Sequence, residues 1–373
     1  MTDTSTRPDL GALITRAAAE LSVPKAAPAD SFVLHAPLEL MARVQLLSHI
    51  PAPSRAPAVE RIEWLRSEYA AAGDPVEAPA DVDAPSNVDA PDAAALLRAI
   101  AEGRQDAVDA IADELLPSMS AAEACGALAE AIVPSLAAAG HAPIGLALLL
   151  RANGTARHLP TTLLRGPLRG VAARPEWRID WHRAIDGKGR ADGLYDALRS
   201  APHLGEPGSN FIFPLMTQAQ QPGLADRLLG PVLADRYDVT AALHTLTRVA
   251  AWSMIHDDPA QAPYGWSHAL TMPQGVMTLA GAGVAARTAL AVAATHVLGF
   301  RVAYGAEALP ARIEPMTARV SAAELATAAS AHEDAHLVKY TLACLYAAAD
   351  DRDYAGLYLN AAASLAEWWR ANG

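Results

Sequence analysis

The chain has 373 residues, of which 52% are hydrophobic and only 5% are aromatic, and its formal net charge is −12. An acidic chain with scattered basic residues argues against a nucleic-acid partner. Alanine dominates the apolar residues, and no segment alternates β-branched residues with polar ones, which favours helices over sheets. The length allows a large core. We therefore expect an all-α protein, with residues 1–373 forming one large helical domain or two packed helical halves.

The sequence also predicts a cytoplasmic protein. Cys125 and Cys344 lie in apolar helical surroundings, as expected of buried thiols rather than of a secreted disulfide scaffold. The first residues lack the basic stretch and apolar run of a signal peptide. Residues 276–304 are the most membrane-like, but Arg287, His296 and several glycines interrupt them. We expect a buried helix pair there, and no membrane partner.

The N-terminal part of the chain contributes the first candidate ligand. Residues 8–21 predict one helix, and Asp30 or Ser31 is expected to cap a second. His35 stands in the first turn of this second helix, where it faces either a buried site or solvent. Further on, residues 73–92 form a tract of Pro, Asp and Ala that cannot bury enough apolar surface to order itself. We predict a flexible loop at this tract, within the domain.

Residues 93–151 predict a dense run of helices in which one histidine interrupts an apolar helix start. Gly140 breaks the chain just before His141, and Pro143 falls in the first turn of the next helix. A single imidazole in such surroundings fits a buried ligand site. It fits equally well a core histidine that is bonded to a backbone carbonyl.

Residues 224–255 predict one or two helices, in which the apolar neighbours of His244 suggest that it faces inward. His268 follows where a loop turns into a further helix, within the sequence W-S-H-A-L-T. His256 lies between these two histidines. We treat His268 as the candidate ligand, and His244 and His256 as residues that could take its place in the same cavity.

The stretch A-H-E-D-A-H-L-V-K-Y-T contains the densest group of candidate metal-binding and catalytic side chains. It lies within residues 321–349, whose Ala and Leu content without Gly or Pro predicts one continuous helix. On a helix, His332, His336 and Lys339 fall within a sector of roughly 60°. Two imidazoles and an amine on one face suggest a metal ion opposite them. The alternative is a solvated face of an exposed helix.

Two alternative kinds of metal site fit this stretch of sequence. In the first, His332, Glu333 and His336 satisfy the H-E-x-x-H pattern, in which two histidines hold zinc and the glutamate is the general base of a metallopeptidase or related hydrolase. No third ligand follows at the usual spacing. Lys339 is also awkward in this interpretation, because an ammonium beside a dication is repelled.

The second interpretation uses the lysine. D-A-H-L-V-K, followed by T-L-A-C-L-Y-A-A-A-D-D-R-D-Y-A-G-L-Y-L-N-A-A, resembles the C-terminal signature of the questin oxidase-like family. The resemblance implies a helical oxygenase of the kind associated with opening an anthraquinone ring. It further implies a non-haem iron held by four histidines and by a lysine carboxylated by CO2. Carboxylation turns a cationic amine into an anionic oxygen ligand, which suits a hard iron centre.

Carried over residue by residue, the resemblance assigns catalytic and metal-binding roles to His336 and Lys339. The segment around His268 is similar to the family's H-A-V-T segment. His35 matches only as a histidine in a helical setting, because L-H-A-P-L lacks the Asn and Met of the family pattern. His141 matches as a histidine at the head of a helix. The implied ligands are therefore His35, His141, His268, His336 and carboxylated Lys339, in a helical core.

The implied cofactor is Fe(II), with dioxygen as co-substrate, and the implied substrate is a polycyclic aromatic or quinone-type small molecule. The reaction would be C–C cleavage or a Baeyer–Villiger-like oxygen insertion. No G-x-G-x-x-G turn is present, so electrons would come from the substrate or from an external reductant such as NADPH. Tyr264, Trp266 and Tyr340 flank the ligands and could stack on the substrate, and Asp334 could orient an imidazole. A non-catalytic helical ligand-binding protein remains the alternative.

Overall fold

The computed structural model describes residues 10–26, 31–76, 92–152, 159–184, 193–208, 211–234 and 238–373. Within these ranges the chain forms seventeen α-helices and no β-strand, only three isolated β-bridges. The all-α prediction is confirmed. Most of the loop predicted at residues 73–92 lies outside the described residues.

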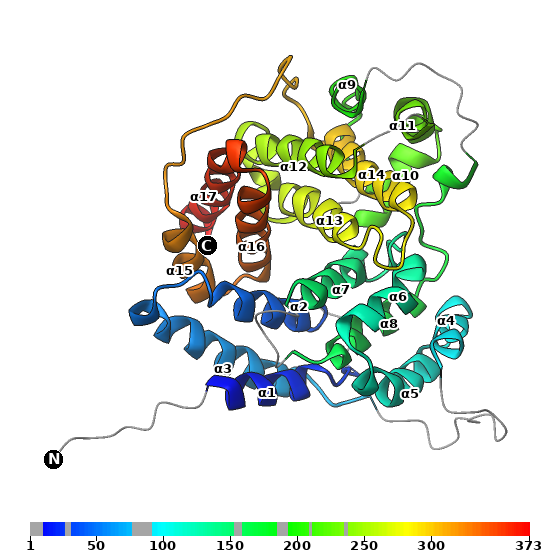
Figure 1. Cartoon of the computed structure of the whole chain (residues 1–373), viewed down its shortest axis with the longest axis vertical. Coiled ribbons are helices and arrows are strands. Elements are labelled where there is room, and N and C mark those ends of the chain that lie inside the picture. Colours follow the sequence, from blue (N-terminus) through cyan, green and yellow to red (C-terminus); the bar gives the residue numbers. More distant parts are fainter. Residues whose placement is uncertain are drawn as a thin grey trace.

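The helices succeed one another around a shared core (Figure 1). They are α1 (Leu10–Leu21), α2 (Ser31–Leu46), α3 (Ala56–Ala71), α4 (Ala93–Ala101), α5 (Gln105–Leu115), α6 (Ala121–Ile132), α7 (His141–Ala152), α8 (Arg165–Ala172), α9 (Leu194–Arg199), α10 (Ile212–Gln220), α11 (Leu224–Ala234), α12 (Val239–His256), α13 (Ser267–Thr278), α14 (Ala286–Tyr304), α15 (Ala322–Ala331), α16 (Ala335–Asp350) and α17 (Ala355–Asn372).

Four of these helices, α2, α7, α13 and α16, form the centre of the molecule (Figure 1). In α2 every residue from 35 to 46 is buried, and in α13 every residue from 267 to 277 is buried. A helix that is buried on all sides belongs to the interior of a large domain. Gly275 shows how close the packing is, because a Cβ there would meet the Cα of Ile144 in α7 at 3.2 Å.

The central helices touch one another in the same order along the chain. At their beginnings, the ring of His35 in α2 contacts that of His336 in α16. Ten residues further along both helices, the Tyr346 hydroxyl donates to the Gln45 side chain at 2.5 Å. Contacts at matched positions mean that α2 and α16 run in the same direction.

α13 and α16 also contact each other in the same order along the chain. Rings of His268 and His336 contact each other near the beginnings of α13 and α16, and the Gln274 amide later donates to the Ala343 carbonyl at 2.9 Å. The Gln45 amide also donates to the Leu148 carbonyl of α7 at 3.2 Å, beyond the contact between the His35 and His141 rings, so all four central helices bring their first turns to one end of the core.

The continuous helix predicted for residues 321–349 is wrong. α15 ends at Ala331, His332 is extended (φ −78°, ψ 156°), and α16 starts after Asp334. The Asp334 carboxylate accepts hydrogen bonds from the backbone N–H groups of His336 and Leu337 at 2.8 and 2.9 Å, which makes it an N-cap. Such local bonds compete with helix continuation, so an aspartate in an alanine-rich segment ended one helix and began another.

Residues 276–304 fold as the end of α13 and the whole of α14, which is buried from Ala289 to Tyr304. This agrees with the predicted buried helix pair. In the described part of the chain, no helix combines the length and the apolar character needed to cross a bilayer. Cys125 and Cys344 are both buried thiols, as predicted.

Candidate metal centre

Four imidazoles from the four central helices meet at one place. His35, His141, His268 and His336 are 8%, 1%, 6% and 5% exposed, respectively. Their ring centroids form a closed circuit, with separations of 4.5 Å from His35 to His141, 5.5 Å from His141 to His268, 5.0 Å from His268 to His336, and 4.5 Å from His336 to His35. We call these four residues the imidazole cluster.

Each of the four residues sits near the beginning of its helix. His141 is the first residue of α7, while His268 and His336 are the second residues of α13 and α16. The letters H-A-P occur at residues 35–37 in α2 and again at 141–143 in α7. This repeated triplet is a sequence signal that links the two residues and that the sequence analysis missed.

Backbone carbonyls orient two of the imidazoles. His141 donates from Nδ1 to the Ala138 carbonyl at 2.8 Å, and His268 donates from Nδ1 to the Tyr264 carbonyl at 2.5 Å. A carbonyl only accepts, so the ring proton of each neutral imidazole is on Nδ1. The Nε2 atom of each ring therefore presents a lone pair, as metal-binding histidines do.

Side chains hold the other two rings. Nδ1 of His336 lies 3.4 Å from the Asp334 carboxylate, and Nδ1 of His35 lies 3.1 Å from the Ser31 hydroxyl. A carboxylate on Nδ1 is a common outer partner of a metal-binding histidine, because it fixes the ring and raises its basicity. Asp334 is therefore placed to orient an imidazole, as its position in the sequence suggested.

The Nε2 atoms face inward and need a partner. Those of His35 and His141 are 2.9 Å apart, and Nε2 of His268 is buried with no hydrogen-bond partner among the described residues. Because the ring proton of His141 is on Nδ1, its Nε2 accepts, and either a proton on Nε2 of His35 or a cation shared by both rings provides its partner. Two nitrogens bound at a right angle, each about 2.1 Å from one ion, are separated by about 3 Å.

Distances among three of the four rings agree with a metal site, and His141 is outside this group. The candidate ligand atoms of His35, His268 and His336 all lie within 4.8 Å of one another, so this buried group could hold a metal ion. Burial is the main cause that lowers the pKa of His35 and His268 well below the usual value. Both rings therefore stay neutral and able to bind a cation at neutral pH.

Lys339 lies on α16, three residues after His336, and is 5% exposed. Its ammonium nitrogen has no hydrogen-bond partner in the described part of the protein. Burial lowers the pKa of Lys339 to about 8, although the nearby Asp334 and Glu39 carboxylates oppose the shift. An amine whose pKa lies this close to neutral pH is readily available in its nucleophilic, uncharged form.

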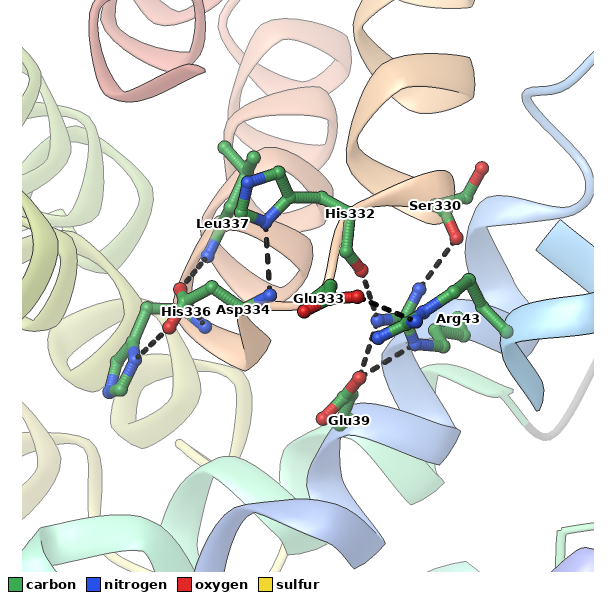
Figure 2. A network of polar contacts seen from close by, with 9 residues as sticks. Glu39, Arg43, Ser330, His332, Glu333, Asp334, His336 and Leu337 are labelled. Atoms are coloured by element: carbon green, nitrogen blue, oxygen red, sulfur yellow. Dashed lines mark hydrogen bonds and ion pairs between the residues drawn. The ribbon is translucent and has the colours of Figure 1, made fainter. Parts of the chain in front are cut away.

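A second polar network fixes the start of α16. Figure 2 shows Arg43 of α2 reaching the break between α15 and α16, where its guanidinium donates to the Ser330 and His332 carbonyls, both at 2.6 Å. Glu39, one turn earlier in α2, pairs with Arg43 at 2.5 Å. Arg43 satisfies carbonyls that the end of α15 leaves without helical partners. It thereby holds Asp334, and through it His336, in position.

The three aromatic residues predicted to bind substrate are placed differently. Tyr264 is 50% exposed, and its ring meets the His336 ring edge-on with a centroid separation of 4.9 Å. Trp266 is buried and packs against Tyr304 at 6.2 Å, and Tyr340 is fully buried in α16. Among the three, Tyr264 combines access from solvent with a contact to the imidazole cluster.

The alternative histidines lie elsewhere. His332 ends α15, and its Nδ1 accepts a hydrogen bond from the Asp334 backbone at 2.9 Å. It does not lie on one helix with His336, so the shared helical face expected for the H-E-x-x-H interpretation is wrong. His244 lies 3.8 Å from the Asp351 carboxylate, and His256 is exposed.

One further imidazole escaped the sequence analysis as a site residue. His296 on α14 is 2% exposed, and its Nδ1 has no partner within the described ranges. Burial lowers its pKa to about 3, and its nearness contributes to the lowered pKa of His268. The available signal was an imidazole in the most apolar segment of the chain.

Comparison of the chain with protein-family models, with curated proteins and with solved structures finds no match. The resemblance to the questin oxidase-like family therefore stays a prediction. The geometry establishes a narrower statement: a buried group of histidines in an all-helical core could hold a metal ion.

Proposed function

We propose that the protein is a non-haem iron oxygenase that acts on a polycyclic aromatic or quinone-type small molecule. The observation that supports it best is the imidazole cluster. Four histidines, the first and last of them 301 residues apart, come from four helices to one buried point, and Nδ1 of each ring contacts a group outside the cluster. Purely structural histidines have no reason to share this orientation.

The donor set suits Fe(II) when Lys339 is carboxylated. Four neutral imidazoles and one anionic carbamate would leave Fe(II) with a net charge of about +1, in a mixed nitrogen and oxygen environment of the kind that iron accepts. The unmodified ammonium would instead repel the cation. The unpaired Lys339 nitrogen, three residues from His336, supports its membership of the site.

The carboxylation follows from the state of the amine. The lone pair of uncharged Lys339 attacks the carbon of CO2, a C–N bond forms, and one N–H proton leaves for solvent. The product is a carbamate whose oxygens are anionic. A lysine with an ordinary pKa near 10.4 would seldom be uncharged at neutral pH, whereas burial makes that form of Lys339 accessible.

Tyr264 marks the side from which an aromatic substrate would approach. Its half-exposed ring touches His336, while its carbonyl holds the His268 ring. A planar substrate stacked on Tyr264 would lie beside both imidazoles with one edge toward the cluster. Bound Fe(II) would supply the activation of dioxygen, and the chain would position the ring and exclude water.

Metal analysis combined with a lysine series tests this proposal. We expect stoichiometric iron in protein purified without oxygen, and loss of metal from Lys339→Ala and Lys339→Arg. Acetate should restore part of the metal to Lys339→Ala, because it can fill the vacated place. Lys25→Ala is the matched control, since Lys25 lies at the surface and bonds to the Gly73 carbonyl at 2.9 Å.

The outcomes separate the alternatives. Full iron occupancy in Lys339→Ala without acetate would show that the lysine is structural. Stoichiometric zinc would favour a hydrolase with a different ligand set. Absence of metal after anaerobic purification and reconstitution would favour a helical ligand-binding protein.

A further inference from the structure

A narrow cavity begins beside Lys339 and leads away from the imidazole cluster. It lies between α7, α13 and α16, and we call it the shaft. An inner layer of lining residues consists of Ile144, Thr271 and Lys339, and an outer layer consists of Arg151, Thr278 and Tyr346. The inner layer is buried, whereas the outer layer is partly exposed to solvent.

The three helices line the shaft with the same spacing. On each helix the inner residue is three positions after the cluster histidine and the outer residue is seven positions later. Spacings of three and seven keep side chains on one helical face. The shaft is therefore a continuation of the stripe that carries the histidines, and seven residues correspond to about 10 Å along a helix.

The dimensions of the shaft restrict what it admits. Its volume is about 30 Å³, which holds one or two molecules the size of water. A polycyclic substrate needs several times this space. At the outer layer, the Arg151 guanidinium lies over the Tyr346 ring at 4.5 Å and donates to the Thr278 hydroxyl at 3.1 Å. These polar groups contact one another, and the residues that line the shaft nearer to Lys339 are mostly aliphatic.

The shaft and Tyr264 lie on opposite sides of the imidazole cluster. Tyr264 precedes His268 by four residues, whereas the shaft residues follow His268 by three or more. Because the central helices run in one direction, everything before the histidines lies at one side and everything after them at the other. The shaft and the exposed Tyr264 ring thus lie on different sides of the same buried point.

We propose that the shaft is the route by which a small uncharged solute of two or three heavy atoms, the size of dioxygen or carbon dioxide, reaches Lys339 and the imidazole cluster. The larger substrate approaches at Tyr264. The route itself follows from the lining residues, and what the solute does on arrival rests on the function proposed above.

Cyanate tests the route in metal-free protein. Its uncharged form, H–N=C=O, has three heavy atoms in a nearly straight line. The Lys339 amine attacks its carbon, a C–N bond forms, and one amine proton moves to the cyanate nitrogen, which leaves a stable carbamoyl group. We expect mass spectrometry to find this group on Lys339 in the folded protein. Trinitrobenzenesulfonate, which is bulky and charged, should leave Lys339 unmodified.

Variants that narrow the shaft identify the path. Ala147 lines it from α7, so Ala147→Leu should slow carbamoylation of Lys339 about tenfold or more, since a filled interior leaves no path as wide as a water molecule. Ala147→Val is a smaller obstruction in case the leucine disturbs folding. Ala349→Leu, at an exposed position of α16, is the matched control and should leave the rate unchanged.

Equal rates in wild type and in both Ala147 variants would overturn the proposal, as would a Lys339 that cyanate modifies only after denaturation. Xenon under pressure and ¹³C-labelled CO2 distinguish the two solutes. Xenon in the shaft with no carbamate signal at Lys339 would indicate a route for dioxygen, and a carbamate signal that appears more slowly in Ala147→Leu would indicate carbon dioxide. Because no step requires iron, failure here and failure of the oxygenase proposal are distinguishable.

Discussion

Two buried polar clusters in this helical core differ in how their hydrogen bonds are satisfied. In the Asp351 cluster, which comprises Arg248, Asp351 and Tyr358, the Arg248 guanidinium makes two hydrogen bonds of 2.7 Å to the Asp351 carboxylate. The Tyr358 hydroxyl donates to the same carboxylate at 2.8 Å. In the imidazole cluster, by contrast, Nε2 of His268 is buried without a hydrogen-bond partner among the described residues.

The difference separates a structural role from a ligand-binding role. Buried polar atoms in folded proteins are nearly always bonded, because an unsatisfied one costs about 1–3 kcal/mol. The Asp351 cluster is complete as it stands and joins α12 to the beginning of α17. The imidazole cluster is complete only with a further partner. The contrast predicts that substitutions in the Asp351 cluster change the stability of the fold. Substitutions in the imidazole cluster should instead change ligand binding.

The largest expected effect is on metal affinity. His336→Ala removes an inward nitrogen and should weaken metal binding by more than about 100-fold, since even outer partners of metal ligands are worth 10–100-fold. Its matched control is His332→Ala, four residues earlier and outside the cluster. Calorimetric titration with Fe(II) under anaerobic conditions measures both. Equal Fe(II) affinities in the His336→Ala and His332→Ala variants would contradict the assignment of His336 as a metal ligand.

A smaller effect is expected on folding when the Asp351 cluster is changed. Asp351→Asn keeps the shape but weakens the charged hydrogen bonds, and should lower the free energy of unfolding by about 2 kcal/mol. Metal affinity should stay the same. Chemical denaturation of the metal-free protein provides the measurement, and an accompanying loss of metal would show that the two clusters are coupled.

The same variant has a signature in acid. Arg248 and Tyr358 hold the pKa of Asp351 below its ordinary value, against the effect of burial. A carboxylate with a depressed folded-state pKa stabilises above the unfolded pKa near 3.9, and this stabilisation is lost as the pH falls through the folded value. The difference between wild type and Asp351→Asn should therefore shrink below about pH 4. A constant difference down to pH 2 would contradict this assignment.

The smallest expected effect concerns His296, which adjoins the imidazole cluster. Burial lowers its pKa to about 3, so between pH 6.5 and 3 the unfolded chain binds a proton at this residue that the folded chain does not. Stability should be lost as the pH falls through this window. Between pH 6.5 and 5 the loss due to His296 is about 2 kcal/mol, and His296→Gln should abolish it. Identical pH profiles for the variant and wild type would show that His296 is accessible to protons.

The two clusters also show what the sequence could predict. Composition and periodicity were sufficient for the all-α fold, and His141 could be recognised because an imidazole in an apolar helix start is conspicuous. That His35, His141, His268 and His336 meet could not follow from periodicity, since it depends on how four distant helices pack. The resemblance to the questin oxidase-like family predicted that the four residues belong together. The distances between their rings are a separate observation about the same grouping.

The break before α16 was missed for a physical reason. In the sequence, Asp334 is one charged residue in a segment rich in alanine, and helix propensity favours continuation. The break is held by Arg43, which binds carbonyls 287 and 289 residues away along the chain. No local pattern contains that contact. Nearness in sequence to a ligand likewise does not determine which side of a helix faces the site, so the substrate-binding roles of Trp266 and Tyr340 stay predictions.

The helix beginnings at the imidazole cluster also shape its electrostatic field. α7 and α16 start at this point, α2 starts about one turn before it, and each helix start carries the positive end of a backbone dipole, equivalent to about half an elementary charge. A bare dication would therefore enter a region that the backbone already makes positive. Anions gain from the same field. The fold thus favours a metal that arrives with negative companions, and a phenolate over the corresponding neutral phenol.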